Sequence, residues 1–204
     1  MKHRSPSEVE RALDAYRRLI DRYHDTLDLM SDRGREALDE HVRDAEAYVA
    51  VLDALEPSPS RLLDVGSGVG LPGIVIAAHL EDLPVELVER RARRGAFLRM
   101  AAAAVGGDVQ VRIGDVAQLA GPPVDVVTAQ AVGSLWRVYD LTCRRHAADV
   151  VLLARKGPAW REEYQELSAK TGVTPHVVAE VALPERGTLV AVQMQGGATC
   201  PSSG

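Results

Sequence analysis

Cysteine is scarce in this sequence, because Cys143 and Cys200 are the only two. They do not have the spacing of metal ligands, and neither stands beside a cluster of histidines. We therefore expect no metal site. We also expect both thiols to be reduced, as in a cytoplasmic protein.

Long apolar runs are missing as well. No stretch of about 18 uninterrupted apolar residues occurs, and the charged segment Met1 to Glu10 lacks the apolar core of a signal peptide. We expect neither export nor insertion into a membrane.

An excess of positive charge is the third missing feature. The 24 lysines and arginines are outnumbered by 29 aspartates and glutamates, which gives a net charge of -5. General nucleic-acid binders are usually basic, so a nucleic-acid partner would have to be held by a local patch. With 46% hydrophobic and 26% charged residues in a chain of 204, the composition is that of one soluble globular domain.

Two helical patterns occupy the first part of the chain. From Ser7 to Leu29, apolar residues recur at steps of three or four, which is the spacing of one helical stripe. A polar stretch from Ser31 to Arg35 breaks this pattern, and a second one runs to about Leu55, before Pro57. We predict an N-terminal helical cap over residues 1–58.

Short apolar runs then alternate with helical stretches, as in a parallel sheet that is covered on both faces. The last two runs are separated by only four residues, so they must pair as an antiparallel hairpin. We predict an α/β core over residues 59–195, with a mostly parallel seven-stranded sheet, and a flexible tail over residues 196–204. The predicted strands are Arg61 to Val65, Val85 to Val88, Val109 to Ile113, Val124 to Thr128, Val150 to Ala154, Pro175 to Leu183 and Thr188 to Gln195.

A glycine-rich turn follows the first predicted strand. It reads Gly66-Ser-Gly-Val-Gly70 and leads through Leu71-Pro72-Gly73 into a helix. Glycines permit a tight turn and let a ligand approach the backbone. The same residues contain G-x-G-x-x-G, with Glu89 at the distance of a ribose-binding acid, so the motif alone leaves a nicotinamide dinucleotide and S-adenosylmethionine both open.

Two features favour S-adenosylmethionine. Asp64 stands ahead of the glycines, where class I methyltransferases place an acid facing the methionine part of the cofactor, and no second domain remains for a redox substrate. Glu89 is expected at the ribose and Asp115 at the adenine, although a surface acid and a helix cap are the structural alternatives. The predicted cofactor site consists of Asp64, Gly66, Ser67, Gly68, Gly70, Leu71, Glu89, Arg90, Asp115, Val116 and Gln130.

From Tyr16 to Gln193 the sequence resembles the bacterial 16S ribosomal RNA guanine-N7 methyltransferases, also called the glucose-inhibited division protein B family. The most specific element is Leu63 to Gly73, because its Leu-Pro-Gly continuation is similar to this family in particular. The resemblance implies a class I Rossmann-like fold, S-adenosylmethionine as cofactor, and a guanine of ribosomal RNA or of the small ribosomal subunit as substrate. Other similar segments are Asp28-Leu-Met-Ser31, His41-Val-Arg-Asp44, Arg93-Arg94-Gly-Ala-Phe97-Leu98, Lys156-Gly157 and Glu185-Arg186.

The sequence departs from the family on the substrate side. Gln130 stands where the family carries an arginine, and Asp28, Met30 and Ala45 replace an asparagine, a threonine and a serine. The cofactor loop is unchanged. Two alternative functions therefore remain open. One is a methyltransferase that acts on another RNA or on a small molecule, and the other is a protein that binds the cofactor without catalysis.

Guanine N7 has an available lone pair, so its methylation requires alignment of the reactants and no catalytic base. Lys156 and Gln130 are predicted at the methyl-transfer site. The densest basic run, around Arg93 and Arg94, could bind RNA phosphates. Structural roles are the alternatives for Lys156, the arginines and His41. The predicted substrate-binding residues are Arg93, Arg94, His41, Lys156 and Arg186, in a protein expected to be a monomer.

Overall fold

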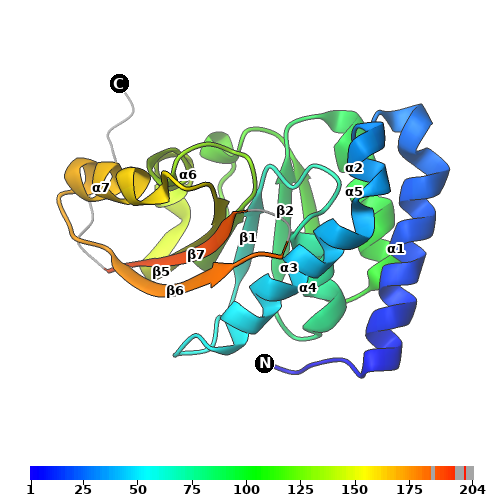
Figure 1. Ribbon diagram of the computed structural model, residues 1–204, viewed down its shortest axis with the longest axis horizontal. Helices are drawn as coiled ribbons and strands as arrows, with labels where there is room; N and C mark the ends of the chain where they lie inside the picture. Colours follow the sequence, from blue (N-terminus) through cyan, green and yellow to red (C-terminus); the bar gives the residue numbers. More distant parts are fainter. Residues whose placement is uncertain (185–186, 196–199, 201–204) are drawn as a thin grey trace.

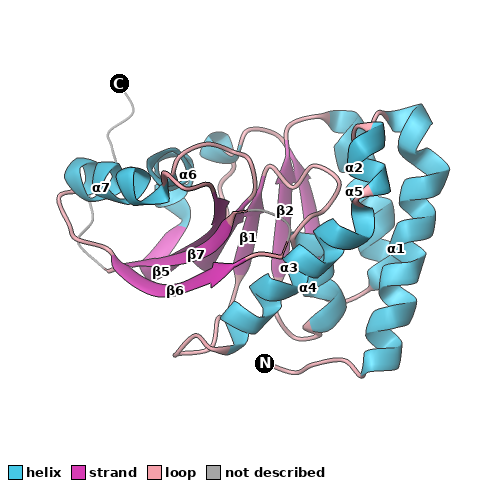
Figure 2. Cartoon of the chain, in the orientation of Figure 1, coloured by secondary structure: helices cyan, strands magenta, loops and turns pink. Residues whose placement is uncertain are grey.

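A computed structural model describes residues 1–184, 187–195 and 200 of the chain. Its centre is a seven-stranded sheet in the order β3-β2-β1-β4-β5-β7-β6, between two layers of helices (Figures 1 and 2). The predicted α/β class is confirmed. The strands are β1 (Leu62–Val65), β2 (Val85–Glu89), β3 (Val109–Ile113), β4 (Val124–Ala129), β5 (His146–Lys156), β6 (His176–Ala182) and β7 (Thr188–Met194).

Strands β1 to β5 pair in parallel, whereas β7 is antiparallel to both β5 and β6. The predicted C-terminal hairpin is therefore confirmed. The carboxyl ends of β1 and β4 meet at one edge, because Val65 lies beside Ala129. The longest strand is β5, which begins at His146 rather than at Val150 as predicted.

Helices cover both faces of the sheet. The α-helices are α1 (Pro6–Leu27), α2 (Asp32–Glu36), α3 (Leu38–Asp53), α4 (Gly73–His79), α5 (Ala92–Val105), α6 (Leu135–Thr142) and α7 (Trp160–Thr171), and the short 3-10 turns are η1 (Val116–Gln118) and η2 (Cys143–Arg145). One apolar core joins α1, α3, α4 and α5 to the sheet, and a second joins α6 and α7 to the opposite face. The N-terminal cap thus shares its core with the helices of the sheet domain.

The first helix follows from its sequence. Ser5 and Glu8 form a capping box at its start, and Asp28, with φ of 50°, ends it. Its apolar stripe packs on α5, where the rings of Tyr16 and Phe97 lie 6.4 Å apart. This helix ends at Leu27, before the polar stretch from Ser31 to Arg35 that we predicted to break the pattern, and most of that stretch forms α2.

The state of the two cysteines differs most clearly from the prediction. Cys143 and Cys200 form a disulfide with a Cα–Cα distance of 5.5 Å, so the expectation of reduced thiols was wrong. Their 57-residue separation gave no sign of the contact, because cysteine spacing alone does not reveal connectivity. Apart from Cys200, the predicted flexible tail lies outside the described residues.

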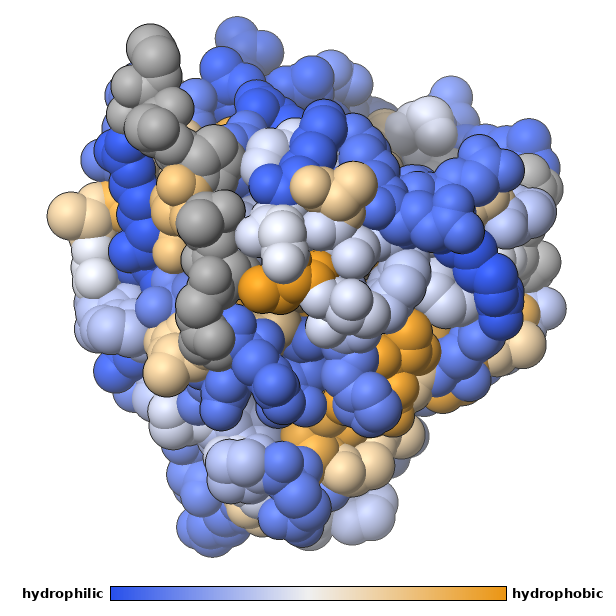
Figure 3. Space-filling model, turned by 90° about the vertical axis from the view of Figure 1, so that its left-hand side faces the viewer, coloured by the Kyte–Doolittle hydropathy of each residue, from blue (hydrophilic) through white to orange (hydrophobic). Residues whose placement is uncertain are grey.

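On the side of the molecule that carries α7 and β6, apolar surface lies between polar side chains (Figure 3). Val181 of β6 is the one large apolar side chain classed as exposed among the described residues, at 37%. No helix in the described part of the chain has the length and apolar character needed to cross a membrane. Those residues also contain no group of three potential metal ligands.

Candidate cofactor and substrate site

The glycine turn after β1 is held by its own backbone. The N–H groups of Gly66 and Ser67 donate to the carbonyl of Val88 at 2.9 and 3.1 Å. Gly66 and Gly68 have φ angles of 66° and 58°. Residues that carry a side chain adopt such angles only with strain. From the cap, the Tyr16 hydroxyl donates to the carbonyl of Val69 at 3.0 Å. The turn predicted from the sequence is therefore a fixed loop at the carboxyl edge of the sheet.

Glu89 ends β2 beside this loop and is only 7% exposed. Its Oε2 accepts a hydrogen bond from the Gly68 N–H at 2.9 Å, and its Oε1 accepts one from the Arg91 N–H at 2.8 Å. A carboxylate oxygen can accept more than one hydrogen bond, so both oxygens keep acceptor capacity for a ligand. The alternative of a solvated surface acid was therefore wrong for Glu89. The neighbouring Arg90, also predicted at the cofactor site, is exposed.

Asp64 is fully buried at the end of β1. Its Oδ1 accepts a hydrogen bond from the Thr128 hydroxyl at 2.7 Å, while its Oδ2 has no hydrogen-bond partner among the described residues. Burial raises the pKa of Asp64 to about 6, although the hydrogen bond from Thr128 opposes this shift. A buried carboxylate with an unpartnered oxygen is suited to a nearby cation.

A pocket of about 190 Å³ extends from the loop towards the ends of β2 and β3. Asp115 lies in its wall and also caps η1, because its Oδ1 accepts from the Ala117 N–H at 3.1 Å. Both roles considered for Asp115 are therefore compatible. Sequence reasoning missed Val132, Arg137 and Leu141, which come from the segment after β4 and carry no motif. The lining is Val65, Gly66, Val88, Glu89, Arg90, Gly114, Asp115, Val116, Val132, Arg137 and Leu141.

The pocket fits an adenosine-bearing cofactor. Its cradle depends on small residues, because a Cβ on Gly66 would lie 2.9 Å from Cγ2 of Val132. The carboxylate of Glu89 lines this pocket together with Asp115 and Val116. The remaining loop residues of the prediction, Ser67, Gly70 and Leu71, shape the turn or lie next to it.

The side chain of Lys156, which was predicted to contact the substrate, is buried. It is 6% exposed, and its Nζ lies 2.8 Å from Oε2 of Glu163 on α7 and donates to the carbonyl of Gly133 at 2.5 Å. Glu163 also accepts from the Leu135 N–H at 2.9 Å. The ion pair therefore ties the segment after β4, which contains half-buried Gln130, to β5 and α7.

The other predicted substrate residues are dispersed. Arg93 is exposed on α5, while Arg94 reaches back to the carbonyl of Asp28 at 3.5 Å. His41 lines a separate pocket of about 400 Å³ with Arg33 and Arg155. Sequence reasoning missed both arginines, although Arg155 directly precedes Lys156. Arg186 lies outside the described residues.

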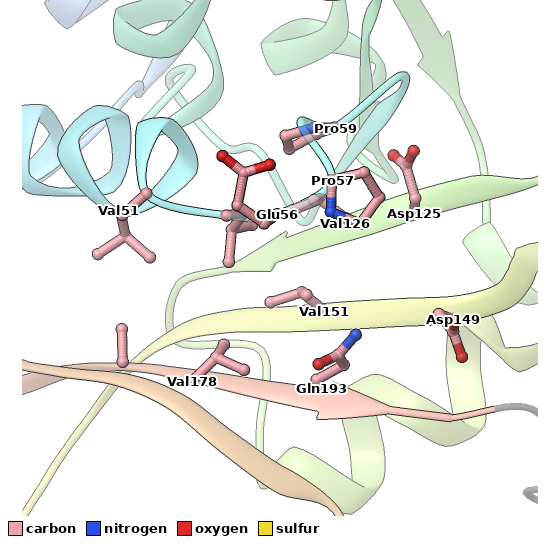
Figure 4. Close-up of a pocket in the computed structure, with 13 residues that line it drawn as sticks. Val51, Glu56, Pro57, Pro59, Asp125, Val126, Asp149, Val151, Val178 and Gln193 are labelled. Atoms are coloured by element: carbon pink, nitrogen blue, oxygen red, sulfur yellow. The ribbon is translucent and has the colours of Figure 1, made fainter.

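A third pocket, of about 210 Å³, lies near the start of β4 (Figure 4). Its walls are mostly aliphatic and come from the end of α3, the proline-rich segment after it, and β4 to β7. Val126 and Val151 form part of its floor, and Glu56, Asp125 and Asp149 are its ionisable residues. The glycine loop follows the other end of the strands, so this pocket is not the predicted cofactor site.

The sheet order and the loop define a class I S-adenosylmethionine-dependent methyltransferase. The fold matches magnesium protoporphyrin IX methyltransferase from Synechocystis, solved with bound S-adenosylmethionine, with a TM-score of 0.59, 16% identity and 89% coverage of each chain. It also matches a putative class I methyltransferase from Listeria monocytogenes, with a TM-score of 0.67, 13% identity and coverage of 94% of this chain and 71% of the other.

The family described as rRNA small subunit methyltransferase G matches residues 9–187. Curated relatives with that name include a protein of Leptothrix cholodnii, 35% identical over 79% of this chain and 76% of the relative. Another, from Acidothermus cellulolyticus, is 42% identical over 64% of this chain and 60% of the relative. The chain belongs to this family of ribosomal RNA methyltransferases.

Proposed function

We propose that this protein transfers the methyl group of S-adenosylmethionine to N7 of a guanine in small-subunit ribosomal RNA, in the cytoplasm. The cofactor assignment is supported by the pocket that is built from the glycine loop, with its positive φ angles, and the fixed carboxylate of Glu89. The substrate is supported by membership in the rRNA small subunit methyltransferase G family.

Different residues along this edge of the sheet bind different parts of the cofactor. Glu89 accepts the ribose hydroxyls, Asp115 and Val116 contact the adenine, and the unpartnered Oδ2 of Asp64 acts on the cationic ammonium end. Gly66 and Gly68 keep side chains out of the cofactor's path. When bound, the cofactor supplies a methyl group on a positively charged sulfur.

The acceptor side requires positioning rather than proton removal, because guanine N7 presents a lone pair. The Lys156–Glu163 pair holds the segment from Gln130 to Leu135 in place, so we assign Lys156 to positioning. Correct alignment of two reactants contributes up to roughly 7–11 kcal/mol in favourable cases. Exposed Arg93 is placed to contact RNA backbone.

A second candidate is methylation of a different RNA or of a small molecule by the same site. One observation favours it. Gln130, which replaces an arginine of the family, lies directly after β4 at the edge where the cofactor loop begins. A neutral amide cannot make the charged, bidentate contacts of a guanidinium.

Calorimetry with S-adenosylhomocysteine tests the cofactor assignment. Gly68 and Gly172 both have positive φ angles, and neither has an atom within 3.4 Å of an added Cβ, but Gly172 lies at the end of α7. Both alanine variants should therefore incur similar strain. We expect Gly68→Ala to weaken S-adenosylhomocysteine binding by about tenfold or more and Gly172→Ala to leave it unchanged. Tight binding of a nicotinamide dinucleotide, without binding of S-adenosylhomocysteine, would overturn the proposal.

A further inference from the structure

An open pocket of about 400 Å³ lies between the cap and the end of β5. Three of its residues carry basic side chains, and each comes from a different element: Arg33 from α2, His41 from α3 and Arg155 from β5. Among the described residues that line it, Glu40 is the only acidic one. These lining residues are Ser31, Arg33, Gly34, Ala37, Glu40, His41 and Arg155.

The register of the sheet places this pocket at the reaction edge. Ala154 of β5 lies beside Ala129 of β4, so Arg155 is level with Gln130. Successive side chains of a strand point to opposite faces. Accordingly, Arg155 pairs with Asp44 of α3 on the cap side, whereas Lys156 pairs with Glu163 on the other side.

The pocket has fixed as well as available donors. Asp44, only 3% exposed, lies 2.9 Å from Nη1 of Arg155 and holds that guanidinium at the wall. The Nδ1 atom of His41 is buried and lacks a hydrogen-bond partner among the described residues. Arg33 is exposed, and no acidic group in the described part of the chain forms an ion pair with it. Asp44 neutralises Arg155 and Glu40 adds a second carboxylate, so an anion would be attracted by the guanidinium of Arg33 and the imidazole of His41.

We propose that this pocket binds a phosphate group of the acceptor RNA beside the nucleotide to be methylated. The inference rests on the proposed function and adds a subsite to it. Arginine is suited to this contact because its planar guanidinium matches the geometry of phosphate oxygens. The pocket would then fix the RNA backbone on the cap side, while the cofactor lies in the separate pocket at the glycine loop.

Arg33→Ala is the informative variant, because Arg155→Ala would also leave the buried carboxylate of Asp44 without its ion pair. Arg43→Ala is the matched control, since Arg43 is an exposed arginine on α3 outside the pocket lining. RNA affinity is measured over a series of salt concentrations, using a small-subunit ribosomal RNA fragment and protein saturated with S-adenosylhomocysteine. The affinity for S-adenosylhomocysteine itself should not change in either variant.

We expect Arg33→Ala to weaken RNA binding by about tenfold and to reduce the salt slope by about 0.7 to 0.9, which is the contribution of one phosphate contact. Arg43→Ala should change neither. In a second measurement, inorganic phosphate should shift the imidazole resonances of His41 in the wild type more strongly than in Arg33→Ala.

The possible outcomes distinguish a failure of the phosphate subsite from a failure of the proposed function. If the wild type binds RNA and Arg33→Ala binds it equally well, the subsite is wrong and the proposed function stands. If the wild type binds S-adenosylhomocysteine but no RNA, the proposed function fails and the subsite with it. A His41 response to inorganic phosphate without any RNA binding would identify a site for free phosphate and contradict the RNA assignment.

Discussion

Asp64 has a structural role in the sheet and, in the proposed function, a role in binding the cofactor. Its carboxyl group has no exposed surface, joins β1 to β4 through Thr128, and keeps one oxygen without a partner among the described residues. Burial of an ionised carboxylate is unfavourable, which is the physical cause of its raised pKa. When no cation lies nearby, this unfavourable burial lowers the stability of the folded protein.

This cost predicts a pH dependence of stability. The pKa of Asp64 is raised from 3.8 to about 6, so between these values the folded protein binds a proton that the unfolded chain releases. The contribution of Asp64 is fully present below pH 3.8 and is lost as the pH rises through about 6, by up to about 3 kcal/mol. Urea denaturation from pH 4 to 7 should show this fall in the wild type and not in Asp64→Asn. Parallel profiles of the two proteins would show that Asp64 ionises normally.

Gln130 provides the second test at the scale of one residue. An arginine at this position would add a charged donor level with Arg155, where it could contact phosphate or the O6/N7 edge of guanine for about 1–3 kcal/mol. If the protein is a weakened member of its family, Gln130→Arg should raise kcat/KM on small-subunit ribosomal RNA by about tenfold, with unchanged affinity for S-adenosylhomocysteine.

The control for this variant is Gln110→Arg, which adds the same charge at an exposed position on β3. Lower activity of Gln130→Arg would instead identify Gln130 as a specificity determinant for another substrate. Equal effects of the two variants would place position 130 outside the acceptor site.

Between elements, the buried Lys156–Glu163 pair joins β5 to α7 and holds the segment that follows β4. A positioning role predicts that Lys156→Met and Glu163→Ala both weaken S-adenosylhomocysteine binding, because Val132 of that segment lines the cofactor pocket. Their effects should be non-additive in the double variant, with a coupling of about 1 kcal/mol or more. Calorimetry on the four proteins measures this coupling.

A direct RNA contact by Lys156 gives a different pattern. Lys156→Met would then weaken RNA binding and reduce its salt slope, while Glu163→Ala would leave cofactor affinity unchanged. That result would restore the role predicted from the sequence and contradict the positioning role.

The elements differ in how far the sequence determined them in advance. The seven strands and the hairpin were predictable, because buried strands consist of apolar runs and the link between β6 and β7 is too short for a parallel crossover. The extension of β5 back to His146 was not, since His146, Ala147, Ala148 and Asp149 do not form such a run. The α2 helix was missed for a related reason: it is five residues long and buries none of them.

For the candidate site, local motifs were informative and long-range contacts were not. The glycine loop and Glu89 were predicted because a strand, a turn and an acid follow each other closely in the chain. The pairing of Lys156 with Glu163 and of Arg155 with Asp44 depends on which helix covers which face, and no spacing rule gives that. The disulfide between Cys143 and Cys200 belongs to the same class of contact.

At the scale of the whole molecule, an acidic protein is proposed to bind an acidic partner. Because the net charge is -5, the proposed association with RNA would depend on local groups such as Arg33, Arg93 and Arg155. The predicted monomeric state and the division into cap, core and tail stay predictions. The disulfide removes the argument from reduced thiols for a cytoplasmic location, so this location stays a prediction.

The most direct test of the central claim is to incubate the purified protein with S-adenosylmethionine and small-subunit ribosomal RNA, as free RNA and as assembled subunit, and to map modified nucleotides by mass spectrometry. RNA from cells that lack the gene provides an unmodified substrate. We expect N7-methylguanosine at one position in at least one of the two substrates, and at subsaturating S-adenosylmethionine we expect slower methylation by Gly68→Ala but not by Gly172→Ala. Binding of S-adenosylhomocysteine without methylation of either substrate, or methylation at an atom other than guanine N7, would contradict it.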